Sequence, residues 1–190
     1  MRLCPPARSL RFPRKSVFRR LSYWLVSMTL VFLPGCAGKP ENVSPVSDFD
    51  IDRYLGRWYE ICRLDHWFER GLTKVTAEYS VDSEGSIKVL NRGYSAETGT
   101  WKEAVGTAKF AGNPDQGFLQ VSFFGPFYAS YVIFDLDKEG YQYAFVSGKN
   151  TSYLWLLARA PRVSESVKIA FENRAGSLGF PVDKLIWLDQ

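Results

Sequence analysis

The sequence predicts an all-β domain with a single helix near its C-terminal end. Eight short β-like runs lie between Gly56 and Arg159, and turn signals separate them about every 10–15 residues. In residues 73–81, TKVTAEYSV, apolar and polar side chains alternate as in a strand with one buried face. Helical spacing is found in one segment, residues 164–179. Regular short strands with Gly-rich turns are typical of a β-sandwich or a β-barrel.

Each predicted strand is an apolar or alternating run that stops at a turn signal. DSEG, ETGT, GNPDQG and Gly-Pro separate the earlier runs, and KEG and GKN separate the later ones. The eight runs are residues 57–64, 73–81, 86–94, 101–110, 118–124, 127–137, 141–147 and 151–159.

The predicted helix covers residues 164–179. Ser164 can cap its start, and Gly179 and Pro181 end it. A short final strand, KLIWL, follows at residues 184–188. The side chains at helical spacing are Val167, Ala170, Phe171, Arg174 and Leu178.

Residues 1–35 have the pattern of a secretory signal. Residues 1–20 contain seven Lys or Arg and no acid, and an apolar run at residues 21–33 and a small-residue site follow. The run is shorter than the roughly 20 residues that a membrane span needs. A permanent N-terminal anchor helix is the alternative interpretation.

LPGC, residues 33–36, resembles the lipobox of bacterial lipoproteins. The resemblance implies that Cys36 becomes the first residue, with diacylglycerol on its sulfur and an acyl chain such as palmitate on its amine. It also implies the outer membrane, facing the periplasm, because Ala37 rather than Asp follows the cysteine. Residues 36–50 are then a lipidated N-terminus and a flexible tether, with a root-mean-square length of roughly 20 Å.

The net charge of +4 belongs to the signal and not to the domain. Without the seven cations of residues 1–20, 17 Lys and Arg stand against 20 Asp and Glu. The sequence therefore does not indicate a nucleic-acid partner.

Cysteine and histidine are too few for a disulfide, metal or haem site. Cys62 stands alone once Cys4 is removed with the signal and Cys36 is acylated. His66 is the one histidine in the sequence. We therefore expect no metal and no cofactor.

Trp58 and Arg159 are predicted to meet at one end of the domain. Trp58 lies near the start of the first run and Arg159 at the finish of the eighth. If the strands run up and down and the sheet closes, these ends are neighbours, and the guanidinium can cover the indole. An ordinary core tryptophan and a solvated arginine are the alternative.

The same residues carry a resemblance to a known family. GRWYE, residues 56–60, matches the Gly-x-Trp opening of lipocalins, and the Arg that ends LWLLAR, residues 154–159, matches their late Arg. The order of segments from about Phe49 to Asp189 resembles bacterial outer-membrane lipocalins. The resemblance implies an eight-stranded antiparallel up-and-down barrel with one C-terminal α-helix, a lipocalin domain at residues 51–190, and storage or transport of fatty acids or lysophospholipids, with a role in envelope stress.

An eight-stranded barrel has room for one small ligand, and strand alternation predicts what lines it. On the Trp58 face this places Glu60 and Cys62 inside, and on the Arg159 face Leu157. An elongated aromatic pocket with few polar groups suits an acyl chain. The predicted pocket residues are Glu60, Val75, Ala77, Tyr79, Val89, Asn91, Val121, Phe123, Tyr131, Tyr143, Tyr153 and Trp155.

The loops after the odd-numbered strands lie opposite Trp58 and form the predicted mouth. The first of them contains His66, Trp67 and Phe68, and the run from Phe123 to Tyr128 contains Phe127. An aromatic rim of this kind often marks membrane or partner contact, although loops folded over their own barrel are the ordinary alternative.

Two rival functions remain open at this stage, and so does a homodimer. In a lipocalin-like enzyme, Cys62 is the nucleophile and His66 the nearest base. In a structural lipoprotein, the barrel is filled by its own side chains.

Overall fold

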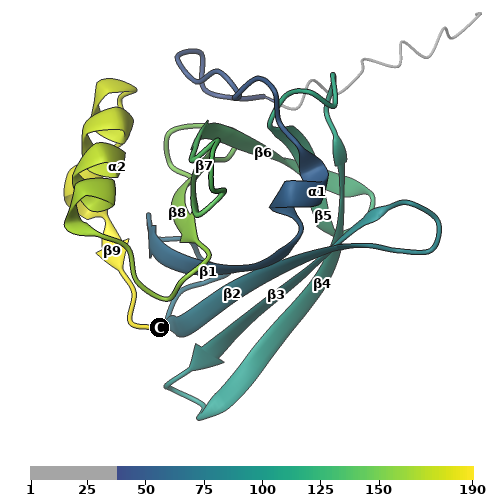
Figure 1. The fold of residues 1–190 in the computed structure, drawn as a ribbon. Helices are drawn as coiled ribbons and strands as arrows, with labels where there is room; N and C mark the ends of the chain where they lie inside the picture. Colours follow the sequence, from purple (N-terminus) through teal and green to yellow (C-terminus); the bar gives the residue numbers. More distant parts are fainter. Residues whose placement is uncertain (1–37) are drawn as a thin grey trace, which may run out of the picture. The chain divides into compact units, whose positions relative to one another are not determined.

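The computed structural model describes residues 38–190 (Figure 1). The predicted signal peptide and Cys36 lie outside the described residues. Among the residues described, no helix is long and apolar enough to span a membrane. The strands are β1 (Gly56–Arg63), β2 (Leu72–Val81), β3 (Ile87–Ser95), β4 (Thr100–Phe110), β5 (Phe118–Phe124), β6 (Phe127–Leu136), β7 (Tyr143–Ser147), β8 (Leu154–Ala158) and β9 (Ile186–Trp187). The helices are α1 (Ile51–Tyr54), α2 (Glu165–Ser177) and the 3₁₀ turn η1 (Val182–Lys184).

The strands form a closed antiparallel barrel, which confirms the predicted fold. Consecutive strands pair from β1 to β8, and β1 also pairs with β8. β9 pairs with β1 outside the ring, opposite Cys62 and Arg63. In Figure 1, α1 lies at one end of the barrel and α2 beside its outer wall.

A β-bulge in β1 decides which side chains point into the barrel. Pairing with β8 shifts register between Glu60 and Cys62, so strict alternation fails there. Ile61 and Cys62 pack in an apolar cluster on the outside of the barrel, whereas Arg63 is buried against Glu60. The predicted inward position of Cys62 is therefore wrong, because the bulge reverses the faces after Glu60.

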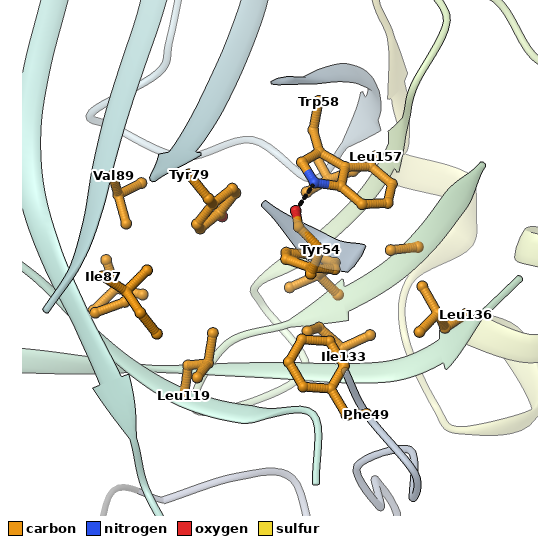
Figure 2. Packing of buried hydrophobic residues seen from close by; sticks show 14 of the residues in the cluster. Phe49, Tyr54, Trp58, Tyr79, Ile87, Val89, Leu119, Ile133, Leu136 and Leu157 are labelled. Carbon is orange, nitrogen blue, oxygen red and sulfur yellow. Dashed lines mark hydrogen bonds between the residues drawn. The ribbon is translucent and has the colours of Figure 1, made fainter. Parts of the chain in front are cut away.

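Two apolar clusters lie on the two sides of the sheet. The inner cluster fills the barrel near α1 and includes Tyr54, Trp58, Tyr79 and Leu119 (Figure 2). The outer cluster joins the sheet to α2 through residues such as Phe171.

The helix matches its prediction in place but not in every contact. Phe171, Ala175 and Leu178 are buried, whereas Ala170 is exposed. Ser164 occupies the N-cap position, yet its side chain bonds the Ser166 hydroxyl and not the backbone.

Arg159 and Trp58 close the α1 end of the barrel. The guanidinium carbon lies 3.9 Å from the centroid of the indole ring. Arg159 also donates hydrogen bonds to the carbonyl oxygens of Arg53, Arg57 and Tyr141. The indole Nε1 donates to the Tyr54 carbonyl at 2.8 Å (Figure 2). One cation thus joins α1, β1 and the β6–β7 loop to the end of β8.

The prediction of a flexible tether at residues 36–50 is wrong for residues 38–50, which pack on the barrel. The side chain of Val43 is fully buried, and Phe49 belongs to the inner cluster. The Val46 amide donates to the Ile133 carbonyl, and the Val46 carbonyl accepts from Gly117. The polar composition of the segment hid these few apolar residues and backbone bonds, which hold it on the barrel.

We expect Arg159→Ala to lower the free energy of unfolding by about 2–3 kcal/mol, since it removes the cation–π contact and the hydrogen bonds to three backbone carbonyls. Urea denaturation followed by far-UV circular dichroism measures the change. Arg57→Ala is the matched control, because the Arg57–Glu78 ion pair is exposed and contributes about 0–1 kcal/mol. Equal losses in the two variants would contradict the assigned role of Arg159.

Candidate functional site: the barrel interior and its mouth

Most of the predicted pocket residues face the inside of the barrel. Asn91 is the cross-strand partner of the inward residue Ala77 and therefore faces the same way. Val75 also faces inward, because a Cβ atom on Gly93, two residues after Asn91, would be 3.3 Å from its side chain. Residues of the inner cluster, or packed against it, are Ala77, Tyr79, Val89, Val121, Phe123, Tyr131, Trp155 and Leu157.

Tyr143 is the exception among the predicted pocket residues. It packs against the outer cluster, with its ring 5.5 Å from that of Phe145. The inward residues of β7 are Ala144 and Val146. The prediction was wrong because the strand begins at Tyr143 itself, and the tyrosine that points to the interior, Tyr141, lies in the preceding loop.

A tyrosine from α1, which was not among the predicted interior residues, fills the closed half of the barrel. The ring of Tyr54 lies 4.6 Å from Trp58 and 5.3 Å from Tyr79, centroid to centroid. Its hydroxyl is 2.7 Å from that of Tyr131. Burial raises the pKa of Tyr54, Tyr79 and Tyr131, so all three stay neutral. Together with the other residues of the inner cluster, these rings occupy this half of the barrel (Figure 2).

The half of the barrel nearer the mouth is open to solvent. Ala104 pairs with Asn91 and Ala129 pairs with Val121, which places both alanines on the inner face. Both are nonetheless exposed, whereas Ala108, deeper on the same face of β4, is buried. Gly106 lies between the two positions on β4 and adds no side chain to the space.

A buried charged cluster stands at the β1–β2 side of this interior. Arg63 donates to the Glu60 carboxylate at 2.6 Å and to the Glu69 carbonyl at 2.8 Å. The Glu69 carboxylate accepts from Trp155 Nε1 at 3.1 Å. Two buried carboxyl groups thus lie near one guanidinium, which bonds only that of Glu60. Burial raises the pKa of Glu60 and of Glu69, and Arg63 opposes the shift in each.

Arg63 and Glu69 were not among the predicted site residues. Ideal alternation turns Arg63 outward, and only the bulge brings it in. Glu69 lies in a loop, where sequence gives no periodicity to read. One sequence feature could have indicated this ion pair. Arg63 follows Glu60 by three residues within an apolar strand, and a charged side chain in such a strand is rarely buried without a partner of opposite charge.

His66 lies beneath the rim and not on it. Its ring is only 4% exposed and stacks between Phe68 and Tyr153, at centroid distances of 5.3 and 4.9 Å. The Trp155 ring is tilted against the imidazole, at a centroid distance of 4.7 Å. Burial, with a smaller contribution from Arg63, lowers the pKa of His66 to about 4. The imidazole is therefore neutral at pH 7.

The other predicted rim residues are exposed. Trp67 is 77% exposed, Phe68 46% and Phe127 79%. Phe124, on the same β5–β6 hairpin, is 77% exposed. The β1–β2 loop therefore has two faces, with His66 and Glu69 directed inward and Trp67 outward.

Cys62 and His66 do not form a catalytic pair. Cys62 is buried in the outer cluster, whereas His66 stacks on the inward Trp155. Burial raises the pKa of the Cys62 thiol, and the nearby Glu60 raises it further. Among residues 38–190, no group of three His, Cys, Asp or Glu is placed to hold a metal ion.

A groove of about 320 Å³ lies on the outer face of β1–β4, separate from the interior. The Arg57–Glu78 and Arg92–Glu103 ion pairs line it. Its walls combine these exposed ion pairs with Tyr59, Leu90 and Trp101.

Comparison with known proteins identifies close relatives. Residues 49–190 match the family model of the Lipocalin-like domain. The chain is 58% identical over 160 residues to the outer membrane lipoprotein Blc of Vibrio cholerae, covering 84% of this chain and 94% of that protein. It is 48% identical over 151 residues to the Blc of Escherichia coli K12, covering 80% and 85%. The solved structure of insecticyanin from the tobacco hornworm Manduca sexta has the same fold, with a TM-score of 0.63 at 23% identity, covering 80% of this chain and 87% of that one.

We expect Cys62 to react with a thiol reagent at least about 100-fold more slowly than an exposed cysteine, because burial disfavours the thiolate and blocks access. Alkylation kinetics, read at the Cys62 peptide by mass spectrometry, measure the rate. Ser177→Cys, on the exposed end of α2, is the control. A native rate equal to that of the control would restore the nucleophile hypothesis.

We expect His66 to make folding less stable as the pH falls from about 6.5 to about 4. In this window the unfolded chain binds a proton at His66 and the folded chain does not, so acidification favours unfolding. Between pH 6.5 and pH 4, the free energy of unfolding of the wild type should fall by about 2 kcal/mol more than that of His66→Phe. This value allows for solvent screening near the mouth. Denaturation at several pH values measures the difference, in which the shared effects of Glu60 and Glu69 cancel. A difference that does not change with pH would contradict the buried neutral imidazole.

Proposed function

Because this chain belongs to the lipocalin family, we propose that it binds fatty acids or lysophospholipids in its barrel and carries or stores them in the cell envelope. In this proposal, lipidated Cys36 anchors it to the outer membrane on the periplasmic side. Maintenance of the membrane under envelope stress is the role that fits such a carrier.

The observation that carries the proposal is a barrel closed at one end and open at the other. Tyr54, Trp58 and Arg159 block the α1 end. Ala104 and Ala129 are exposed on the inner wall nearer the mouth. A cup of this form admits an acyl chain from one side only. A barrel filled throughout, as in a purely structural lipoprotein, would bury both alanines.

The inner wall is apolar with a few polar groups, as a lipid pocket requires. The half-buried Phe123 and the exposed Ala104 and Ala129 offer apolar surface to an acyl chain. The Asn91 Oδ1 atom is buried without a hydrogen-bond partner among the described residues, so it is free to accept from a head group. The Glu60–Arg63 pair supplies charge on the same side of the barrel.

Energetics restrict the ligand class. Burying a chain of about 16 carbons gains roughly 12 kcal/mol at about 0.8 kcal/mol per CH₂, and association costs roughly 4–15 kcal/mol. A bilayer offers the chain nearly the same gain. The protein therefore competes best for lipids that leave the bilayer readily, which single-chain fatty acids and lysophospholipids do.

A binding role also fits better than an enzymatic one. Hydrolysis or acyl transfer needs a nucleophile and a base within hydrogen-bond reach inside the pocket. Cys62 faces the outer cluster, and His66 is a neutral ring held in an aromatic stack.

We expect Ala104→Phe to weaken lysophospholipid binding about tenfold or more, because the new ring overlaps the proposed ligand. Titration followed by tryptophan emission measures the affinity, and Trp155→Ala should abolish most of the emission change. Val105→Phe is the matched control, since Val105 is 61% exposed and faces outward.

Unchanged binding in Ala104→Phe would contradict a ligand site in the mouth half of the barrel. Native mass spectrometry of protein purified from cells gives an independent measurement. A carrier should retain acyl species, and their complete absence would favour the structural lipoprotein.

A further inference from the structure

We propose that the barrel is held mouth-first against the membrane that carries its anchor, with the aromatic tips of the β1–β2 and β5–β6 loops in the lipid interface. The inference rests on the lipidation of Cys36 in the proposed function. It adds an orientation and a membrane-contact surface to that function.

The first described residue lies at the mouth. A Cβ atom on Gly38 would be 4.0 Å from the carbonyl oxygen of Lys149. Lys149 follows β7, in the turn that leads to β8. Because the strands alternate in direction, this turn lies at the same end as the β1–β2 and β5–β6 loops, opposite Trp58.

From Gly38 the chain runs along the barrel toward the closed end and is held there. Val43 is buried in the outer cluster, and Val46 is hydrogen-bonded to Ile133 and Gly117. The Phe49 amide donates to the Asp115 carbonyl, in the β4–β5 loop at the closed end. Residues 43–50 therefore supply no slack between the anchor and the barrel.

Covalent geometry then limits where the anchor can be. Cys36 is two residues before Gly38, so their Cα atoms are at most about 7–8 Å apart. A strand of ten residues such as β2 is roughly 33 Å long, so even a tilted barrel separates its ends by more than 20 Å. Two residues cannot span that length. A lipid on Cys36 must enter the bilayer next to the mouth.

The surface at the mouth suits a bilayer. Trp67, Phe124 and Phe127 are each more than three-quarters exposed and belong to loops on either side of the β7–β8 turn. Tryptophan and phenylalanine are favoured at the membrane interface, and exposed apolar groups gathered at one end mark a contact surface.

The turns between strands at the opposite end of the barrel are acidic. Residues 82–85, 112–116 and 137–140 contain five Asp or Glu and one Lys, whereas Arg53 and Arg159 lie on the α1 side of this end. An anionic membrane surface repels such turns. The charge of these turns therefore favours the same orientation as the anchor position.

Depth-dependent fluorescence quenching tests the orientation. Phe127→Cys at the mouth and Glu84→Cys at the closed end are each labelled with an environment-sensitive dye in the full lipoprotein, and buried Cys62 supplies the background. The protein is reconstituted in phosphatidylethanolamine–phosphatidylglycerol vesicles with or without nitroxide-labelled lipids. We expect severalfold quenching at position 127 and none above the soluble-dye background at position 84.

Quenching that is equal at the two positions, or stronger at position 84, would overturn the proposal. Absence of quenching at position 127, in protein whose intact mass shows acylated Cys36, would also overturn it. An intact mass that shows no acylation of Cys36 would overturn it as well. Self-quenching between labelled copies at position 127, without quenching by lipid, would instead indicate a dimer through the mouth. Lysophospholipid titration of the same samples reports ligand binding separately, so failure of the orientation is distinguishable from failure of the carrier function.

Discussion

The contact between the Arg159 guanidinium and the Trp58 indole is the constraint on which the rest of the structure depends. The guanidinium covers the ring at 3.9 Å and also donates to carbonyls from α1, β1 and the β6–β7 loop. It thereby joins the first and last strands of the ring where they meet. Without a closed sheet, β1 and β8 would be edges, and the interior would have no floor.

With the floor in place, the two halves of the barrel have different properties. The closed half is filled by Tyr54, Trp58 and Tyr79 and gains stability from burial. The half nearer the mouth contains the Glu60–Arg63 pair and small inner side chains such as Ala104, so it has more open space and less stabilisation from burial. This division of packing, rather than any reactive group, makes the fold suitable for holding a ligand.

The N-terminal segment connects the proposed lipid anchor to this division. Because Val43 and Val46 are packed on the barrel wall, an anchor on Cys36 cannot reach the closed end. Under the proposed orientation, a lipid that leaves the bilayer near Phe127 meets the mouth without crossing bulk water. Exposure of the acyl chain to water is a large barrier to its exchange, since each exposed CH₂ costs about 0.8 kcal/mol.

The sequence by itself determined the strand order, the C-terminal helix, the meeting of Trp58 with Arg159 and the inward face of β2, because these follow from periodicity and closure. Only the tertiary structure decided the inward turn of Arg63, the outward positions of Cys62 and Tyr143, the insertion of Tyr54, and the docking of residues 38–50. The physical reason is common to these cases. A bulge, a strand start, a short helix and a polar segment each break periodicity locally, and only packing against distant residues selects which way their side chains face.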